Sequence, residues 1–315
     1  MRHLLNIADL SPAEFHDLLA VAGYLKKRRN SGTPEHALGG KTLAMVFEKP
    51  SLRTRVSFEL AATELGGSAM YIRGEELGIG VRETIEDVAR VFGRMVHGIM
   101  ARVFKHETVE GLAQHSGIPV VNGLSDYSHP CQAIGDFLTI KEQFGRIDGL
   151  RVVYIGDANN VCRSLAQACM LAGSTLVVAC PQAYAFTAED IRSFGPAWGK
   201  AVEQIHDPRA AVKGAHVLYT DVWTSMGQEA ERAARLAAFQ GYQINEALVA
   251  LADASAKVMH CLPAHRGEEI THGAMECSQS VVFDQAENRL HAQKAVLRLL
   301  MGSEPERVIA AARGV

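Results

Sequence analysis

Ser51, Arg53, Thr54 and Arg55 stand within five residues of one another, directly after an apolar run that ends at Phe47. Helical periodicity begins here, so free backbone N–H groups with a partial positive charge are available to bind an anion. The two hydroxyl groups add donors, and the two guanidinium groups bind phosphate in a bidentate manner. A serine cap before a solvated basic turn explains a lone serine, but this density of donors favours a phosphate site.

More polar side chains stand at the ends of apolar runs farther along the chain. Arg102 lies near the end of one run, and His129 opens a later helical pattern, with Gln132 one turn farther on. In the second half of the chain, Asp221 and Cys261 each follow an apolar run. Taken singly, each has a structural explanation, such as a surface ion pair, a helix cap, a turn residue or an inert core thiol. Because ligands bind beyond the carboxyl ends of strands in open α/β sheets, these positions are nevertheless where chemistry is expected.

No cofactor or metal motif accompanies these residues. Residues 156–160 (GDANN) lie between an expected strand and an expected helix, but the GxGxxG fingerprint of dinucleotide-binding proteins is missing. The six cysteines form no CxxC pair, and the sequence contains no HExxH and no other close-spaced His/Cys set. We therefore expect no cofactor, no metal ion and no disulfide framework.

Apolar runs and helical periodicity alternate in two successive blocks. The expected strands are 42–47, 99–104, 118–121, 151–155, 175–180, 216–222 and 257–261. The expected helices are 53–65, 85–96, 109–115, 130–145, 161–171 and 288–301. The alternation predicts an α/β fold with two doubly wound parallel-sheet domains joined by helices. Glycines and charges interrupt the pattern at 143–149, which predicts domains at 1–144 and 145–287.

The composition excludes several functional classes. A chain of 315 residues suits two domains of ordinary size, and a net charge of −3 gives no broad attraction to nucleic acid. No apolar run approaches the roughly 20 residues that span a membrane. Acidic residues appear early, which is not typical of a signal or transit peptide. We therefore expect a cytoplasmic protein that binds neither nucleic acid nor a membrane.

Four motifs together resemble those of the aspartate and ornithine carbamoyltransferase family. Residues 47–55 (FEKPSLRTR) are similar to its carbamoyl-phosphate loop, and residues 129–132 (HPCQ) to its second phosphate-domain motif. Residues 221–227 (DVWTSMG) and 260–263 (HCLP) are similar to the two motifs of its ornithine branch. The resemblance implies transfer of the carbamoyl group of carbamoyl phosphate to the δ-amine of L-ornithine. The products would be L-citrulline and phosphate, as in arginine biosynthesis.

The resemblance also implies a role for individual residues. The carbamoyl-phosphate contacts would be Ser51, Leu52, Arg53, Thr54, Arg102, His129, Gln132, Cys261, Leu262 and Arg289. The ornithine contacts would be Asn160, Asp221, Ser225 and Met226. The expected catalytic residues are Cys261, Arg102, His129 and Asp221. Domain 1–144 would bind carbamoyl phosphate and domain 145–287 ornithine, while the C-terminal helix, 288–315, would pack back on the first domain.

Within this scheme, Arg102 and His129 match the positions that polarise the carbonyl group, where negative charge develops during the reaction. Gln132 would contact the carbamoyl amide. Asn160 would contact the ornithine carboxylate, and Asp221 the cationic α-amino group. Cys261 would lie beside the ornithine side chain, where its thiol would orient the amine or take its proton through the aspartate.

Gly78 departs from the family pattern. Many members carry a glutamine there that reaches the phosphate site of a neighbouring subunit, and no glutamine occurs near this position. The resemblance still implies a homotrimer, with Arg55 and the segment 75–82 as the residues able to reach across.

Two alternatives remain open. One is a carbamoyltransferase for aspartate, putrescine or an acylated ornithine, which the combination of Asn160, Asp221 and Ser225 disfavours. The other is a non-catalytic relative that binds carbamoyl phosphate, but such a protein would be expected to have lost Arg102, His129 or Cys261. The residues do not distinguish the biosynthetic from the degradative direction of arginine metabolism.

Overall fold

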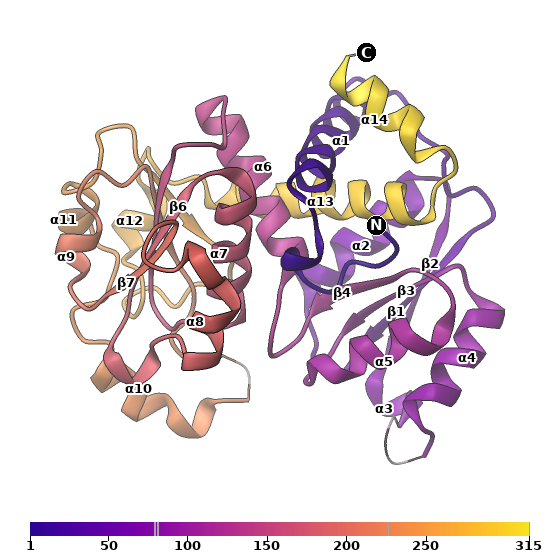
Figure 1. Ribbon diagram of the computed structural model, residues 1–315, viewed down its shortest axis with the longest axis horizontal. Coiled ribbons are helices and arrows are strands. Elements are labelled where there is room, and N and C mark those ends of the chain that lie inside the picture. The colour runs from indigo at the N-terminus through magenta and orange to yellow at the C-terminus, as the bar shows by residue number, and fades with distance from the viewer. Residues whose placement is uncertain (79, 81, 226, 315) are drawn as a thin grey trace. The chain divides into compact units, whose positions relative to one another are not determined.

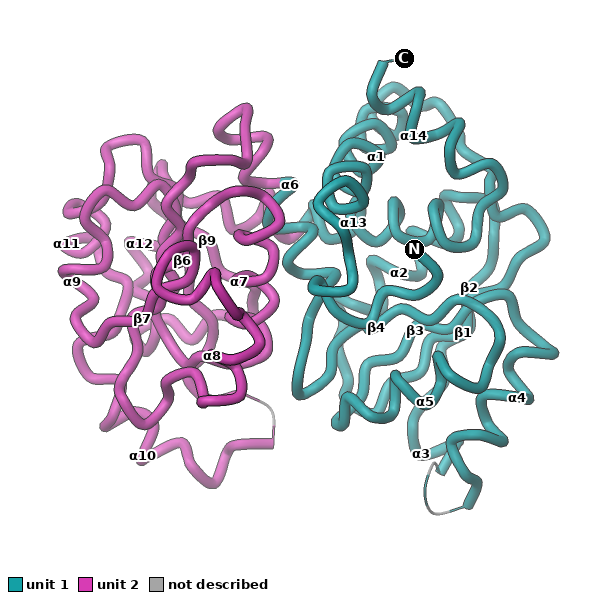
Figure 2. Tube along the Cα trace, viewed as in Figure 1, with its two compact units in different colours: residues 1–138, 287–315 teal, residues 139–286 magenta. Residues whose placement is uncertain are grey.

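The computed structural model of the chain describes residues 1–78, 80, 82–225 and 227–314 (Figure 1). They form two compact units, residues 1–138 with 287–315 and residues 139–286 (Figure 2). The chain passes from the first unit to the second inside α6 (Pro130–Phe144) and returns inside α13 (Val282–Met301). Both crossings therefore lie within helices and not within loops.

The first unit contains a parallel sheet with the strand order β2-β1-β3-β4. Its strands are β1 (Thr42–Phe47), β2 (Ser68–Arg73), β3 (Gly98–Arg102) and β4 (Val120–Leu124). Strand β2 lies on one side of β1, and β3 and β4, which come later in the chain, lie on the other side. Phe47 pairs with Arg102, so the loops after β1 and β3 begin side by side at the same edge of the sheet. In a doubly wound sheet this point is where ligands bind.

Helices cover both faces of this sheet. They are α1 (Pro12–Asn30), α2 (Leu52–Glu64), α3 (Gly74–Leu77), α4 (Ile85–Met95), α5 (His106–Ser116), α14 (Pro305–Arg313) and the short helix η1 (Ile7–Asp9). In Figure 1, α4 and α5 lie on one face and α1, α2 and α13 on the other. Buried side chains of β1, β3, β4, α4 and α5 form a core on the first of these faces.

The second unit contains a parallel sheet with the strand order β7-β6-β5-β8-β9. Its strands are β5 (Arg151–Ile155), β6 (Thr175–Ala179), β7 (Val202–Ile205), β8 (Val217–Thr220) and β9 (Lys257–His260). Here the order reverses between β5 and β8, whose residues Tyr154 and Tyr219 are paired. The loops after β5, β8 and β9 therefore meet at one edge of the sheet.

The helices of the second unit are α7 (Asn160–Ala172), α8 (Ala188–Phe194), α9 (Pro208–Ala211), α10 (Arg232–Ala238), α11 (Glu246–Val249) and α12 (His272–Glu276), with short helices η2 (Gln182–Tyr184), η3 (Gly195–Ala197) and η4 (Glu229–Glu231). Buried side chains of α9, α11 and α12 pack with those of β5, β6, β8 and β9 in one core. Helix α7 packs against β6. No helix in the described residues is both long enough and apolar enough to cross a membrane.

The predicted fold class is confirmed, since both sheets are parallel and carry flanking helices. Two strands were not predicted, β2 and β7, which each lie at one edge of their sheet and are only partly buried. Their partly exposed side chains include polar ones, so these two strands lack the continuous apolar run of a strand buried on both faces. Helix α13 begins at Val282, earlier than the predicted 288, and residues 287–315 belong to the first unit, where α14 packs against α1.

Candidate active site

The first residues of α2 form a donor-rich helix start, as predicted. Ser51 is the N-cap of α2, and its hydroxyl oxygen accepts a hydrogen bond from the Thr54 N–H at 3.3 Å. Thr54 Oγ1 accepts from Ser51 Oγ at 3.0 Å and from Arg289 Nη2 at 2.8 Å. The side chain of Leu52 is 77 % exposed, so only its backbone N–H is suited to bind a ligand at this helix start. The contact between Thr54 and Arg289 joins residues 235 positions apart.

Three buried side chains form an electropositive group within the same unit. Arg102 is the last residue of β3, His129 directly precedes α6, and Arg289 lies in α13. Burial and the charges of Arg289 and Arg102 lower the pKa of His129 well below its usual value. His129 is therefore a neutral imidazole at pH 7 beside two permanent cations. A neutral imidazole donates its one N–H to a developing oxyanion as a hydrogen bond. It lacks the second, more acidic proton of an imidazolium, which would be lost readily.

Among the buried polar atoms of the first unit that have no hydrogen-bond partner in the described residues are Arg53 Nε and Gln132 Oε1. The amide of Gln132 is oriented by a hydrogen bond from its Nε2 to Asp136 Oδ1 at 2.8 Å, which leaves Oε1 as an acceptor. A buried donor or acceptor without a partner costs free energy until a ligand or water pairs with it. The first unit therefore offers a donor for an anion and an acceptor for an N–H group.

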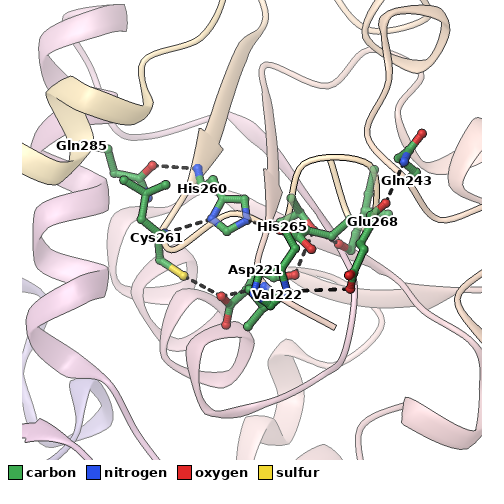
Figure 3. Close-up of polar contacts among 12 residues, drawn as sticks. Asp221, Val222, Gln243, His260, Cys261, His265, Glu268 and Gln285 are labelled. Atoms are coloured by element: carbon green, nitrogen blue, oxygen red, sulfur yellow. Dashed lines mark hydrogen bonds and ion pairs between the residues drawn. The ribbon is translucent and has the colours of Figure 1, made fainter. Parts of the chain in front are cut away.

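In the second unit, the structure brings Asp221 and Cys261 into direct contact (Figure 3). Asp221 follows β8, and its buried carboxylate accepts hydrogen bonds from Cys261 Sγ at 2.9 Å and from the Val222 N–H at 2.8 Å. Asn159 Nδ2 donates to the same carboxylate at 3.3 Å. Within the described part of the chain, no lysine, arginine or histidine forms an ion pair with Asp221. A buried carboxylate without a countercharge is costly, so the site favours an ammonium group on a ligand.

The loop that carries Cys261 is supported by a fully buried pair, His260 and Glu269. His260 Nε2 lies 3.0 Å from Glu269 Oε1, and His260 Nδ1 accepts from the Leu262 N–H at 2.9 Å. The ring proton is therefore on Nε2 and is donated to the glutamate. Leu262 has a φ of +59°, a conformation that costs free energy for a residue with a side chain and that is common at functional sites.

The remaining predicted residues lie on the same edge of the second sheet. Asn160 is the first residue of α7, directly after Asn159, whose side chain caps that helix. The Ser225 N–H donates to Gln228 Oε1 at 3.1 Å. Met226 lies outside the described residues. Cys261 and Leu262, predicted to contact carbamoyl phosphate, belong to the second unit, whereas the other predicted carbamoyl-phosphate contacts belong to the first.

One group of potential metal ligands coincides with the second site. Ligand atoms of Asp221, His260 and Cys261 all lie within 4.8 Å of one another. Both ring nitrogens of His260 are already engaged, by the Leu262 N–H and by Glu269, so a metal ion would have to displace a hydrogen bond. The geometry is thus better suited to hydrogen bonding than to a resident ion.

Comparisons with known proteins cover nearly the whole chain. Residues 2–142 match the carbamoyl-P binding domain of aspartate/ornithine carbamoyltransferase, and residues 148–300 match its Asp/Orn binding domain. The chain belongs to the aspartate/ornithine carbamoyltransferase family. The ornithine carbamoyltransferase of Archaeoglobus fulgidus is 50 % identical over 306 residues, which are 97 % of this chain and 99 % of that protein. The anabolic ornithine carbamoyltransferase of Pyrococcus furiosus is 50 % identical over 304 residues, 96 % of each chain.

Solved structures of this carbamoyltransferase family agree with the fold. The ornithine carbamoyltransferase of Pyrococcus furiosus superposes with a TM-score of 0.92, covering 96 % of this chain and 97 % of that one at 50 % identity. The enzyme from Thermus thermophilus gives a TM-score of 0.87 at 46 % identity, covering 96 % and 99 %. The chain is therefore a carbamoyltransferase, as the motifs predicted.

Several residues of this carbamoyltransferase site were not predicted. Asn159 bonds to Asp221, and the pair of His260 and Glu269 supports the Cys261 loop. His260 is the first residue of the motif 260–263 and directly precedes Cys261, so the sequence did indicate that it lies near the site. Glu269 had no such signal, because its partner becomes known only once the loop after β9 has folded.

Proposed function

We propose that this carbamoyltransferase transfers the carbamoyl group of carbamoyl phosphate to the δ-amine of L-ornithine, giving L-citrulline and phosphate. The observation that carries the choice of amine is the environment of Asp221. Among the described residues, its buried carboxylate accepts hydrogen bonds from neutral donors, Cys261, Val222 and Asn159, and pairs with no cation, which leaves it suited to the cationic α-amino group of an amino acid.

In this proposal the first unit holds carbamoyl phosphate. The start of α2 binds the phosphate oxygens through the backbone N–H groups of Ser51 and Leu52, the Thr54 hydroxyl group and Arg53. Arg102, Arg289 and neutral His129 donate to the carbonyl oxygen, and Gln132 Oε1 accepts from the carbamoyl NH2 group. Cys261 and Leu262 of the second unit complete the set as contacts of the carbamoyl group.

The reaction proceeds by attack of the ornithine δ-nitrogen on the carbonyl carbon. A C–N bond forms, and negative charge moves to the carbonyl oxygen, where Arg102 and His129 stabilise it. The carbonyl double bond then re-forms, and the bond between the carbonyl carbon and the phosphate oxygen breaks. Phosphate leaves with the electron pair of that bond. The proton lost by the amine passes to the leaving phosphate, while the Cys261 thiol, held by Asp221, orients the amine. No cofactor or metal ion takes part in these steps.

The second unit holds ornithine. Asp221 pairs with the α-ammonium group, Asn160 donates to the carboxylate from the start of α7, and Ser225 lies beside the amino-acid end of the substrate. In this proposal, 1–144 binds carbamoyl phosphate, 145–287 binds ornithine, and residues 288–315, with most of α13 and all of α14, return to the first domain. Putrescine lacks both groups that this site holds, and acetylornithine lacks the cationic α-amine, so both are expected to be poor substrates.

A citrulline-formation assay with a panel of amines tests this proposal. Purified protein is supplied with carbamoyl phosphate and with ornithine, putrescine, acetylornithine or aspartate, and kcat/KM is compared among them. We expect ornithine to be preferred by orders of magnitude. Outright preference for another amine would refute the assignment to ornithine, and the lack of transfer to any amine would favour a binding protein without activity.

We further propose a homotrimer in the cytoplasm that serves arginine biosynthesis. A row of exposed apolar side chains on α2 and β2 supports self-association. All six cysteines are free thiols, which is typical of proteins in a reducing compartment. Carbamoyl phosphate and ornithine are the only partners that the proposal needs besides the second and third copies of the chain.

A further inference from the structure

Arg235, in α10, is a buried arginine to which the proposed reaction assigns no role. Only 5 % of the residue is exposed. Buried arginines are uncommon unless their guanidinium group is fully paired. The partners of Arg235 therefore show what its burial achieves.

Its guanidinium group joins four separate parts of the second unit. Nη1 lies 2.7 Å from Asp157 Oδ2, in the loop after β5, and donates at 3.1 Å to the carbonyl oxygen of Trp223, just after β8. Nε lies 2.9 Å from Glu231 Oε2, directly before α10. The Cζ atom lies 4.7 Å from the ring centroid of Tyr184, in η2. The planar guanidinium group makes all of these contacts at once, which a lysine cannot do.

These contacts tie together the segments that carry the amine site. Asp157 is followed by Asn159, which donates to Asp221, and by Asn160 at the start of α7. Trp223 lies between Asp221 and Ser225 on the segment after β8. Arg235 thus fixes the distance between the loop after β5 and the segment after β8, on which the amino-acid contacts depend.

Arg235 also determines which of two neighbouring carboxylates, Asp157 or Asp221, is neutralised by the protein. Asp157 and Asp221 follow neighbouring strands, and burial, together with the charge of Asp221, raises the pKa of Asp157, while Arg235 opposes this rise. Arg235 neutralises Asp157 and leaves Asp221 as the carboxylate that pairs with no cation in the part of the chain that the structure describes. An ammonium ligand is thereby directed to Asp221 and not to Asp157.

We infer that Arg235 is a positioning residue for the amine substrate, holding the two loops of the ornithine site in register and reserving Asp221 for the α-ammonium group. The inference rests on the proposed function, because it concerns the amine of that reaction. It predicts an effect on ornithine alone, since every contact of Arg235 lies in the second unit.

Arg235→Met, Arg235→Lys, Asp157→Asn and the double variant Arg235→Met/Asp157→Asn test the inference. Steady-state citrulline formation gives kcat and the KM for ornithine, and calorimetry gives the Kd for carbamoyl phosphate. Arg232→Met is the matched control, because Arg232 is in the same helix but pairs with Glu268 at the surface. Thermal unfolding of each variant reports whether the fold is retained.

We expect Arg235→Met to raise the ornithine KM by about tenfold or more, since a buried charge loses its partner. The Kd for carbamoyl phosphate should stay within about twofold of the wild-type value, as should both constants of Arg232→Met. Asp157→Asn in the double variant removes the orphaned carboxylate and should recover much of the loss. If Arg235→Met does not fold, Arg235→Lys serves in its place. It keeps the positive charge without the planar guanidinium group and should show a smaller increase in the ornithine KM.

Three results would overturn the inference while wild-type citrulline formation is intact. They are an unchanged ornithine KM in both Arg235 variants, an equal loss of ornithine and carbamoyl-phosphate binding, and a double variant no better than Arg235→Met. Absence of citrulline formation by the wild-type protein would instead refute the proposed function, so the two failures are distinguishable.

Discussion

At the scale of single residues, the proposed carbamoyl-phosphate residues of the first unit and the proposed ornithine residues of the second differ in charge. His129 lies beside two guanidinium groups, those of Arg102 and Arg289, and is kept neutral by burial and by their charges. Asp221 receives hydrogen bonds from a thiol, a backbone N–H and an amide, and from no cation in the described residues. The first group suits an anionic substrate and the second a cationic one.

His129 should make the protein less stable in mild acid. Its pKa is lowered in the folded state, so below about pH 6.5 the unfolded chain takes up a proton that the folded chain does not. The free energy of unfolding should then fall with decreasing pH, by up to about 1.4 kcal/mol per pH unit, until the folded-state pKa is reached. Urea unfolding of wild type and His129→Gln at about pH 7.5 and about pH 5.5 measures this.

The difference between the two proteins isolates His129. Burial also lowers the pKa of His291, so the variant should keep a part of the pH dependence. Identical slopes in the two proteins would show that His129 is protonated equally in the folded and unfolded states.

Asp221→Asn should reduce discrimination between ornithine and putrescine. The variant leaves the buried α-ammonium of ornithine without its countercharge, a loss of about 2–5 kcal/mol in kcat/KM. Putrescine has no α-amine, so its weak background rate should barely change and serves as the internal control. An equal loss with both amines would mean that Asp221 acts on the chemical step and not on the choice of substrate.

At the scale of elements, the close packing of two helices, α4 and α5, helps to hold the carbamoyl-phosphate-binding unit together. Helix α4 packs against α5 through Gly93, where an added Cβ atom would lie 1.9 Å from the Ser116 carbonyl oxygen at the end of α5. Glycine is normally unfavourable inside a helix. Its place in α4 is therefore explained by the close approach of the two backbones.

Gly93→Ala should destabilise the protein although it raises the helix propensity of α4. The methyl group must push α4 away from α5, which should lower the free energy of unfolding by about 1–3 kcal/mol. Gly23→Ala in α1 is the control, because the nearest atom to its Cβ would lie 4.0 Å away. That change should stabilise the protein by up to about 1 kcal/mol. Chemical unfolding of both variants measures the difference, and stabilisation by Gly93→Ala would contradict the packing argument.

At the scale of the whole molecule, an apolar row on the surface supports the proposed assembly. Leu52, Val56 and Leu60 recur at every fourth position of α2 and are 77, 45 and 39 % exposed. Met70 on the neighbouring edge strand β2 is 53 % exposed. Exposed apolar side chains that are grouped on adjoining elements are typical of a subunit interface.

Sedimentation of the purified protein should therefore show a trimer at assay concentrations. Val56→Glu should shift it toward the monomer and reduce citrulline formation, because a charge in an apolar contact must be desolvated. Val91→Glu on α4 is a control of matched exposure, at 44 %. A fully active monomer of the wild-type protein would refute the trimer.

Local patterns in the sequence were sufficient for the central strands and for the helix start at Ser51. The runs at 42–47 and 151–155 are apolar because central parallel strands are buried on both faces, and both were predicted with the bounds that the structure shows. Ser51 was predicted at a helix start and is the N-cap of α2. These features depend on neighbours within a few residues, which a sequence displays directly.

The sequence by itself determined the fold class, the family motifs and the side chains available for chemistry. Only the tertiary structure decided which of them meet: Arg289 with Thr54, Cys261 with Asp221, His260 with Glu269, and Arg235 with Asp157. The physical reason is that the parallel strands bring loops from distant parts of the chain to one edge of a sheet. Burial and charge at that edge, and with them the neutral state of His129, arise only when the sheet has formed.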